Sequence, residues 1–222
     1  MQSIKLKWIK RVLVLFIVIF ISYILYLNSL VKSQFSSEIE PKDNVVQIQN
    51  LIDDYPKELI NMLLLVEDQS FFDHRGVDFK EILRVLYGYL FEEKELRGAS
   101  TITQQLIKNT LLSKDKTLAR KTDEALMAIL MEISYDKNYI LERYMNTVYL
   151  AQQGSTAIHG FASGSLHYFD KDVESLNLEE MATLVALLKG PSYYNPVNSP
   201  DRLSRRVEMI LSMHKNYKKI IQ

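Results

Sequence analysis

Residues 56–68 read PKELINMLLLVED, and this segment sets the kind of fold to expect. Pro56 suits the first position of a helix, where its missing N–H would have no partner in any case. The apolar residues within 59–66 follow one another with so little interruption that they predict a helix buried around most of its circumference. The run ends in two acids, Glu67 and Asp68, so we expect a pair of carboxyl groups where a buried helix stops.

Beyond this segment, apolar residues recur three and four apart through the rest of the chain, which is the spacing of helices. Thr101 with Gln104, and Asn177 with Glu180, have the spacing of a capping box, so a helix is expected to begin at each pair. We expect further helices at about residues 118–134, 140–149 and 202–214. The alternation typical of strands is weak, and the sequence therefore predicts an all-α domain.

The N-terminal part differs from the rest of the chain. Residues 12–31 read VLVLFIVIFISYILYLNSLV, twenty residues without a charge, and a helix of that length spans roughly 30 Å of hydrocarbon. Basic residues precede this segment, which leaves the N-terminus in the cytoplasm by the positive-inside rule. A cleaved signal peptide would have a shorter apolar core and a small-residue cleavage site, and the sequence has neither. We therefore predict a cytoplasmic tail (1–11), a single-pass membrane anchor (12–31), a tether (32–55) and an extracytoplasmic domain (56–222).

The composition excludes several classes of site. The 222 residues include no cysteine, which rules out disulfides, thiol nucleophiles, zinc–thiolate sites and iron–sulfur clusters. The 27 basic side chains are balanced by 27 acidic ones, so the charge gives no support to a nucleic-acid partner.

The acid pair Glu67-Asp68 is the first candidate for chemistry. Burial beside an apolar run raises the pKa of a carboxyl group toward neutrality, which is the condition for a general base. An aromatic segment with Phe71, Phe72 and His74 follows directly. The alternative is an ordinary exposed helix end with solvated acids, and the residues alone leave both interpretations open.

Two further segments could hold an anion. Residues 97–109 read RGASTITQQLIKN, and a glycine-bearing loop at a helix N-terminus presents hydroxyl and N–H groups to a phosphate. Lys108 follows one turn later, although a capped helix with a polar outer face would have the same sequence. Arg120 and Lys121 lie four and three residues before Glu124, and on spacing alone these three residues predict a surface ion pair.

Five motifs occur in order along the chain. They are Glu67-Asp68-x-x-Phe71-x-x-His74-x-Gly76, Gly98-Ala99-Ser100-Thr101-Ile102-Thr103-Gln104-Gln105-Leu106-x-Lys108-Asn109, Arg120-Lys121-x-x-Glu124-Ala125, Ile140-Leu141-Glu142-x-Tyr144-Met145-Asn146-x-Val148-Tyr149, and Lys189-Gly190-Pro191 with Tyr194-Asn195-Pro196. Together they resemble the peptidoglycan glycosyltransferases of family 51 over roughly residues 55–215. The sequence from Arg120 to Pro196 is most similar to the glycosyltransferase half of class A penicillin-binding proteins of the 1B type. The chain ends where their transpeptidase domain would begin, so the resemblance implies a monofunctional version.

The resemblance implies a lysozyme-like, two-lobed fold and the polymerisation of lipid II into β-1,4-linked glycan. Transfer would invert the anomeric carbon and release undecaprenyl pyrophosphate. Glu67 matches the general base, and Glu124 matches a second essential acid near the pyrophosphate. The positions that match residues binding substrate or pyrophosphate are Asp68, His74, Ser100, Thr101, Gln104, Gln105, Lys108, Asn109, Arg120, Lys121, Asn146 and Tyr149.

The resemblance also implies a cofactor, partners and a location. A divalent cation, Mg²⁺ or Mn²⁺, would reach Glu124 through the pyrophosphate. The implied partners are lipid II, lipid-linked glycan, the bacterial cytoplasmic (inner) membrane and other cell-wall synthesis and division proteins. Residues 79–91 are apolar beyond what one buried face requires, so they are the candidate for a lobe that dips into the membrane.

Two other functions stay open at this stage. One is a lysozyme-like enzyme that cleaves the same glycan, and the other is a catalytically silent, membrane-anchored scaffold. The cations at Lys108, Arg120 and Lys121 argue against cleavage, because that reaction has no pyrophosphate to hold. Retention of both Glu67 and Glu124 argues against the scaffold.

Overall fold

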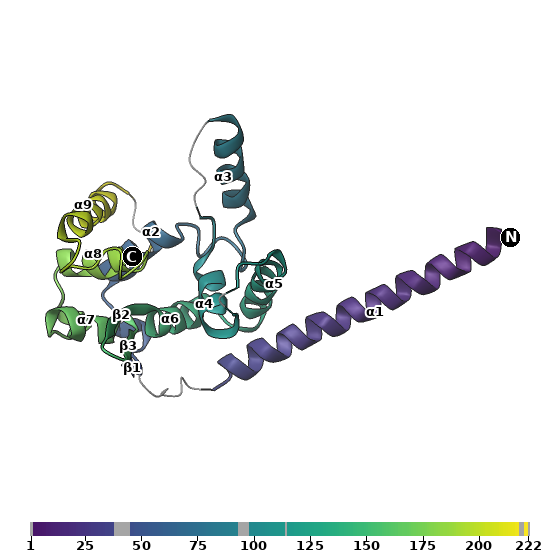
Figure 1. Ribbon diagram of the computed structural model, residues 1–222, viewed down its shortest axis with the longest axis horizontal. Coiled ribbons are helices and arrows are strands. Elements are labelled where there is room, and N and C mark those ends of the chain that lie inside the picture. Colours follow the sequence, from purple (N-terminus) through teal and green to yellow (C-terminus); the bar gives the residue numbers. More distant parts are fainter. Residues whose placement is uncertain (1, 38–44, 93–97, 114, 218–219, 222) are drawn as a thin grey trace.

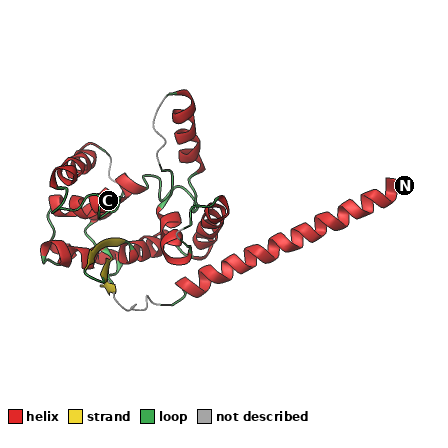
Figure 2. Ribbon diagram, in the orientation of Figure 1, coloured by secondary structure: helices red, strands yellow, loops and turns green. Residues whose placement is uncertain are grey.

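The computed structural model describes residues 2–37, 45–92, 98–113, 115–217 and 220–221. Its helices are α1 (Gln2–Phe35), α2 (Lys57–Glu67), α3 (Phe79–Phe91), α4 (Ile102–Leu111), α5 (Leu118–Ser134), α6 (Lys137–Thr147), α7 (Phe161–Phe169), α8 (Leu178–Leu187) and α9 (Pro200–Asn216). Its strands are β1 (Val45–Gln47), β2 (Tyr149–Gln153) and β3 (Thr156–His159), and 3-10 turns lie at Ile52–Asp54 and Val173–Ser175. Helices dominate the fold (Figures 1 and 2), so the predicted all-α class is confirmed.

Helix α2 lies in the core, as its apolar run predicts. Residues 59–65 are all buried, and the helix packs against α8 and α9. Asn61 in the middle of the run is buried too, but its side-chain amide bonds the backbone of Ile220 and Ile221 at 2.8–3.0 Å. Its polar atoms are therefore satisfied. This packing places the last residue of α2, Glu67, at the edge of the core.

The predicted helix starts are confirmed by their caps. Both capping boxes are formed, Thr101 with Gln104 at α4 and Asn177 with Glu180 at α8. Helix α5 has the predicted bounds, 118–134. Helix α9 begins at Pro200, two residues before the prediction, because proline fits the first helical position.

A small sheet is the part of the fold that the sequence does not predict. Strand β3 lies in the middle, parallel to β1 and antiparallel to β2. The strands have only three to five residues, which is too short for alternation to stand out. The helix predicted at 140–149 consequently ends at Thr147, and Tyr149 belongs to β2.

Helix α1 is longer than the predicted anchor and continues to Phe35. Residues 7–35 form a helix that is long enough and apolar enough to cross a membrane, judged by its length and composition. Figure 1 shows α1 leaving the domain as a single extended rod. Its last turns pack against α5 and α4, where Leu27, Val31 and Phe35 are buried. Part of the predicted tether is thus regular structure in α1 and β1, and residues 38–44 lie outside the described residues.

Helix α3 stands apart from the other helices (Figure 1). Of its thirteen residues only Gly88 is buried. The exposed apolar side chains are Phe79, Ile82, Leu83, Leu86, Tyr87, Tyr89, Leu90 and Phe91. The surplus of apolar surface expected for residues 79–91 is therefore present in the fold.

Candidate active site

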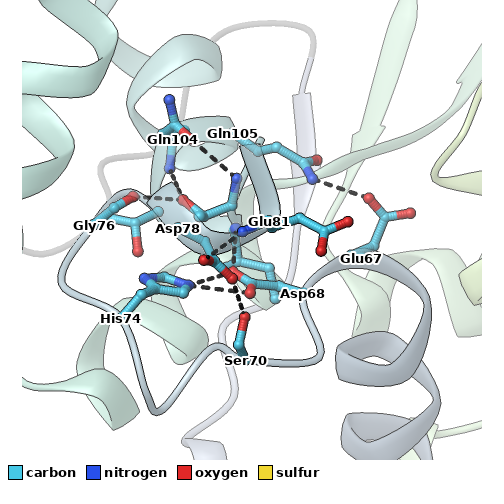
Figure 3. A network of polar contacts seen from close by, with 12 residues as sticks. Glu67, Asp68, Ser70, His74, Gly76, Asp78, Glu81, Gln104 and Gln105 are labelled. Carbon is cyan, nitrogen blue, oxygen red and sulfur yellow. Dashed lines mark hydrogen bonds and ion pairs between the residues drawn. The ribbon is translucent and has the colours of Figure 1, made fainter. Parts of the chain in front are cut away.

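Glu67, the last residue of α2, is held by a hydrogen-bond chain from two other helices. Gln105 of α4 donates its Nε2–H to Glu67 Oε2 at 2.9 Å. Gln105 Oε1 in turn accepts from the hydroxyl of Tyr144 on α6 at 3.1 Å. Burial, followed by the charges of Glu67 and Asp68, raises the pKa of Tyr144 well above its usual 10, so its hydroxyl stays a donor. Figure 3 shows Gln105 reaching across to Glu67, which is half-buried.

Asp68 points the other way from its neighbour Glu67 (Figure 3). Both of its oxygens lie 3.0 Å from His74 Nε2, and Oδ2 also accepts from the N–H of Ile102 at 2.9 Å. Asp68 is buried, so the exposed-helix-end interpretation is wrong for this residue. Its oxygens are used inside the protein, where they tie the end of α2 to the first residue of α4.

The Asp68 contact continues into a buried chain of charges that the sequence analysis missed. Glu132 of α5 accepts from Thr103 Oγ1 at 2.6 Å, lies 2.6 Å from Lys137 Nζ and lies 3.8 Å from His74 Nδ1. The side chains of His74 and Glu132 are 6% and 3% exposed. The available signal was a single acid in the otherwise apolar residues 125–133, because such an acid needs partners when the helix is buried.

A cavity of about 230 Å³ opens beside Glu67. The end of α2 forms one part of its wall, and the segment 98–101 that precedes α4 forms another. In that segment Thr101 is buried and committed to the fold, since its hydroxyl donates to Gly76 O at 2.6 Å and accepts from Gln104 N at 3.1 Å. Ser100 is half-buried and lines the same cavity as Glu67.

Asp78 closes the same cavity at the base of α3. As the helix N-cap it accepts from the N–H of Glu81 at 2.9 Å and from the hydroxyl of Ser70. Burial alone would raise the pKa of Asp78, but these hydrogen bonds and the nearby His74 outweigh it and lower the pKa below its usual value. Asp78 therefore anchors the protruding helix as a carboxylate.

Ser100 connects the cavity to a second carboxylate, Glu124 of α5. Lys121 Nζ donates to Ser100 Oγ at 2.8 Å and pairs with one oxygen of Glu124, while Arg120 Nη1 donates to the other oxygen at 3.1 Å. The Glu124 side chain is 1% exposed, so the surface ion pair predicted from spacing alone is wrong. The two cations outnumber the carboxylate, and this cluster (Arg120, Lys121, Glu124) presents a net positive charge beside Ser100, which suits an anion.

Comparison with known proteins identifies the family. A family model described as transglycosylase matches residues 33–215. The chain belongs to this transglycosylase family. The resemblance seen in its five motifs is thereby confirmed.

Curated relatives carry the same domain within longer chains. The chain is 40% identical to penicillin-binding protein 1B of Haemophilus influenzae over 80% of its own length and 23% of that protein. It is 42% identical to penicillin-binding protein 1B of Escherichia coli over 72% and 19%, and 39% identical to penicillin-binding protein 1F of Bacillus subtilis over 73% and 22%. This transglycosylase chain thus spans about a fifth of the length of the curated relatives it matches.

The remaining predicted site residues fall into two groups in the transglycosylase fold. Lys108 and Asn109 are exposed near the end of α4, whereas Gln104 is buried in the capping box, so of the three only Lys108 and Asn109 face solvent. Asn146 is buried and bonds Asn50 and the hydroxyl of Tyr55. The Tyr149 ring contacts His159 edge-on within the sheet. The structure therefore commits Asn146 to holding the segment around residue 50, and Tyr149 to β2.

The carboxylates of the transglycosylase site determine which residues would hold a divalent cation. The described residues contain no group of three or more His, Asp or Glu side chains placed to hold a metal. Both oxygens of Glu124 are occupied by cations of the protein. Mg²⁺ is commonly bound by one or two carboxylates together with substrate phosphates, and Glu124 would take part in such an arrangement only after Arg120 or Lys121 released one of its oxygens.

Proposed function

We propose that this domain polymerises lipid II, using Glu67 as the general base. The proposal rests on one cavity lined by the half-buried carboxylate of Glu67 and by Ser100, which a hydrogen bond joins to the cluster Arg120, Lys121, Glu124. In that cluster a buried carboxylate is paired with two partly exposed cations, so the charge is positive in excess. A base on one side and an anion-binding group on the other match the two needs of glycosyl transfer from a pyrophosphate donor.

In this reaction the 4-hydroxyl of an incoming lipid II attacks the anomeric carbon of the lipid-linked glycan. Glu67 takes the hydroxyl proton as the new C–O bond forms, and the bond from the anomeric carbon to the pyrophosphate oxygen breaks. The leaving pyrophosphate carries the electron pair away, so the α-linked donor becomes a β-1,4 linkage. The hydrogen bond from Gln105 holds the Glu67 carboxylate in place for this step.

The cluster Arg120, Lys121, Glu124 would stabilise the pyrophosphate as it departs. Lys121 is 46% exposed and Arg120 18% exposed, so both side chains are accessible to a phosphate. Each of them also pairs with Glu124, which keeps the two cations together. Lys108 adds a further exposed cation on α4. Glu124 would help to hold a bound Mg²⁺ or Mn²⁺, and the ion would supply additional charge neutralisation.

The apolar helix supports a location for this reaction. We infer that α1 holds the domain at the outer face of the bacterial cytoplasmic membrane, with the basic N-terminus in the cytoplasm. Lipid-linked substrates are confined to that membrane, so the domain would meet them there. Other cell-wall synthesis and division proteins are the expected protein partners at this location.

The test is polymerisation of labelled lipid II by the detergent-solubilised full chain with a divalent cation, with products resolved by size. Wild type is expected to give a ladder of polymer, and Glu67→Gln none while lipid II binding is retained. Glu179→Gln, an exposed acid on α8, is the matched control and should polymerise normally. Lys108→Ala should raise the KM for lipid II.

Three outcomes contradict the proposal. Loss of binding in Glu67→Gln would remove this residue from the role of base. Shortening of pre-formed glycan by the wild type would indicate a hydrolase. Binding without any polymer from the wild type would favour a scaffold.

A further inference from the structure

The last turns of α1 carry a stripe of four residues that faces the domain. Tyr23, Leu27, Val31 and Phe35 are spaced by four, so they lie on one side of the helix. Leu27, Val31 and Phe35 are buried at 0–2% exposure, whereas Tyr23 is 39% exposed and Leu25, between Tyr23 and Leu27, is 62% exposed. We call these four residues the docking stripe. The burial of Leu27, Val31 and Phe35 shows that the apolar segment of α1 has a protein-facing part as well as an exposed part.

Both ends of the docking stripe have specific contacts. At the C-terminal end of the stripe, the ring of Phe35 meets Tyr135 edge-on, with centroids 6.4 Å apart. The Arg143 guanidinium lies 5.6 Å from the centroid of the Phe35 ring. The hydroxyl of Tyr139 also donates to the backbone oxygen of Phe35. These contacts fix the end of α1 against α5 and α6.

At the N-terminal end of the stripe, the hydroxyl of Tyr23 donates to the carboxylate of Asp123 on α5. Asp123 directly precedes Glu124 in the chain. The hydrogen bond from α1 therefore reaches α5 within one helical turn of the cluster Arg120, Lys121, Glu124.

The length of α1 indicates where the membrane surface crosses it. The charge-free part of α1 begins after Arg11, and Tyr23 comes twelve residues after Arg11, a rise of about 18 Å in a helix. Basic side chains at the inner boundary extend toward water and add several ångströms, so most of the roughly 30 Å of a hydrocarbon core has been crossed at Tyr23. Tyr23 and Tyr26 then lie near the outer interface, where tyrosine is enriched. Leu27 and Val31 lie above that level and are covered by protein.

From this geometry we propose that the docking stripe sets the height of α5, so that the cluster Arg120, Lys121, Glu124 stands at the level of the lipid phosphates. Tyr23 acts as a positioning residue through Asp123. This inference rests on the proposed function, because it explains how a membrane-bound pyrophosphate would meet its cations without leaving the bilayer surface.

The first test measures depth and needs no turnover. The chain has no cysteine, so one cysteine at Leu118, the first residue of α5 and 89% exposed, can carry a single nitroxide label. In phospholipid vesicles the label on the otherwise unchanged chain is expected at the depth of the phosphates. Leu27→Ala with Val31→Ala should move it toward water. The control pair Val18→Ala with Leu25→Ala makes the same changes at exposed positions and should leave the depth unchanged.

The second test separates positioning from general loss of structure. Tyr23→Phe is expected to raise the KM for lipid II embedded in vesicles about fivefold, the effect of one lost hydrogen bond, with kcat unchanged. With a water-soluble, short-chain lipid II analogue the same variant should match the wild type. Equal depth in the docking-stripe and control variants, or an equal KM change with both substrates, would overturn the inference. An inactive wild type would contradict the proposed function but leave the depth result readable.

Discussion

Replacing Gln105 with methionine tests the hydrogen-bond chain behind the proposed base. Methionine keeps the length of the side chain and removes the 2.9 Å hydrogen bond to Glu67. A hydrogen bond to a charged group is worth about 1.5–3 kcal/mol, and each 1.4 kcal/mol changes a rate about tenfold. If the bond serves mainly to orient the carboxylate, Gln105→Met should lower kcat by roughly 10- to 100-fold.

Tyr144→Phe removes the second bond of the chain, between two neutral groups. Such a bond is worth about 0.5–1.5 kcal/mol, so kcat should fall about two- to tenfold. Because the hydroxyl of Tyr144 donates to Gln105 and not to Glu67, its effect should vanish once Gln105 is replaced. The double variant should then match Gln105→Met within about twofold.

The assay is the initial rate of lipid II polymerisation at saturating substrate, with thermal unfolding recorded for each variant. Gln152→Met, at an exposed glutamine of β2, makes the same chemical change away from the cavity and should keep the wild-type rate. The reasoning is refuted if Tyr144→Phe slows the Gln105→Met background by a further factor, because the tyrosine would then act by another route. Wild-type kcat in Gln105→Met would refute it as well.

Three further variants test the structure around the site. Gly76→Ala should destabilise the fold by at least about 2 kcal/mol, measured by denaturant unfolding, because φ is +82° and a Cβ would lie 2.5 Å from the backbone of Ala128. Thr103→Val should cost about 1.5–3 kcal/mol in the same measurement, because the buried Glu132 loses its 2.6 Å hydrogen bond. Asp78→Ala should cost about 1 kcal/mol at pH 7 as a lost N-cap. Since the pKa of Asp78 is lowered in the fold, its stabilisation is present above the unfolded pKa of about 3.9 and is lost as the pH falls through the lower folded value. The difference between wild type and Asp78→Ala should therefore disappear in strong acid.

The features predicted correctly from the sequence are those that depend on neighbouring residues. The capping boxes at Thr101 and Asn177 and the bounds of α5 follow from residues three or four apart. The burial of α2 follows from its own composition. Each of these signals is complete within one or two helical turns, so no knowledge of the fold is needed to interpret it.

The features that were missed depend on contacts between distant parts of the chain. Strand β1 pairs with β3 across more than a hundred residues, and Glu132 is recognisable as buried only when His74 and Lys137 are placed beside it. Glu67 and Asp68 illustrate the same limit at a single site. Glu67 ends the helix, whereas Asp68 has an extended backbone with φ −162°, so the two carboxylates diverge to different partners although they are adjacent in sequence.

Helices α4 and α5 together connect every part of the proposed mechanism. Helix α4 orients Glu67 through Gln105 and receives Asp68 at its first residue. The two helices are joined by the bond from Thr103 to Glu132, and α5 carries Glu124 and the contact of Asp123 with α1. A displacement of α5 relative to α4 would therefore change the separation of base and phosphate cluster at the same time as the height of the site above the membrane. Because these distances share one pair of helices, buried variants such as Thr103→Val are expected to affect polymerisation even where they touch no substrate.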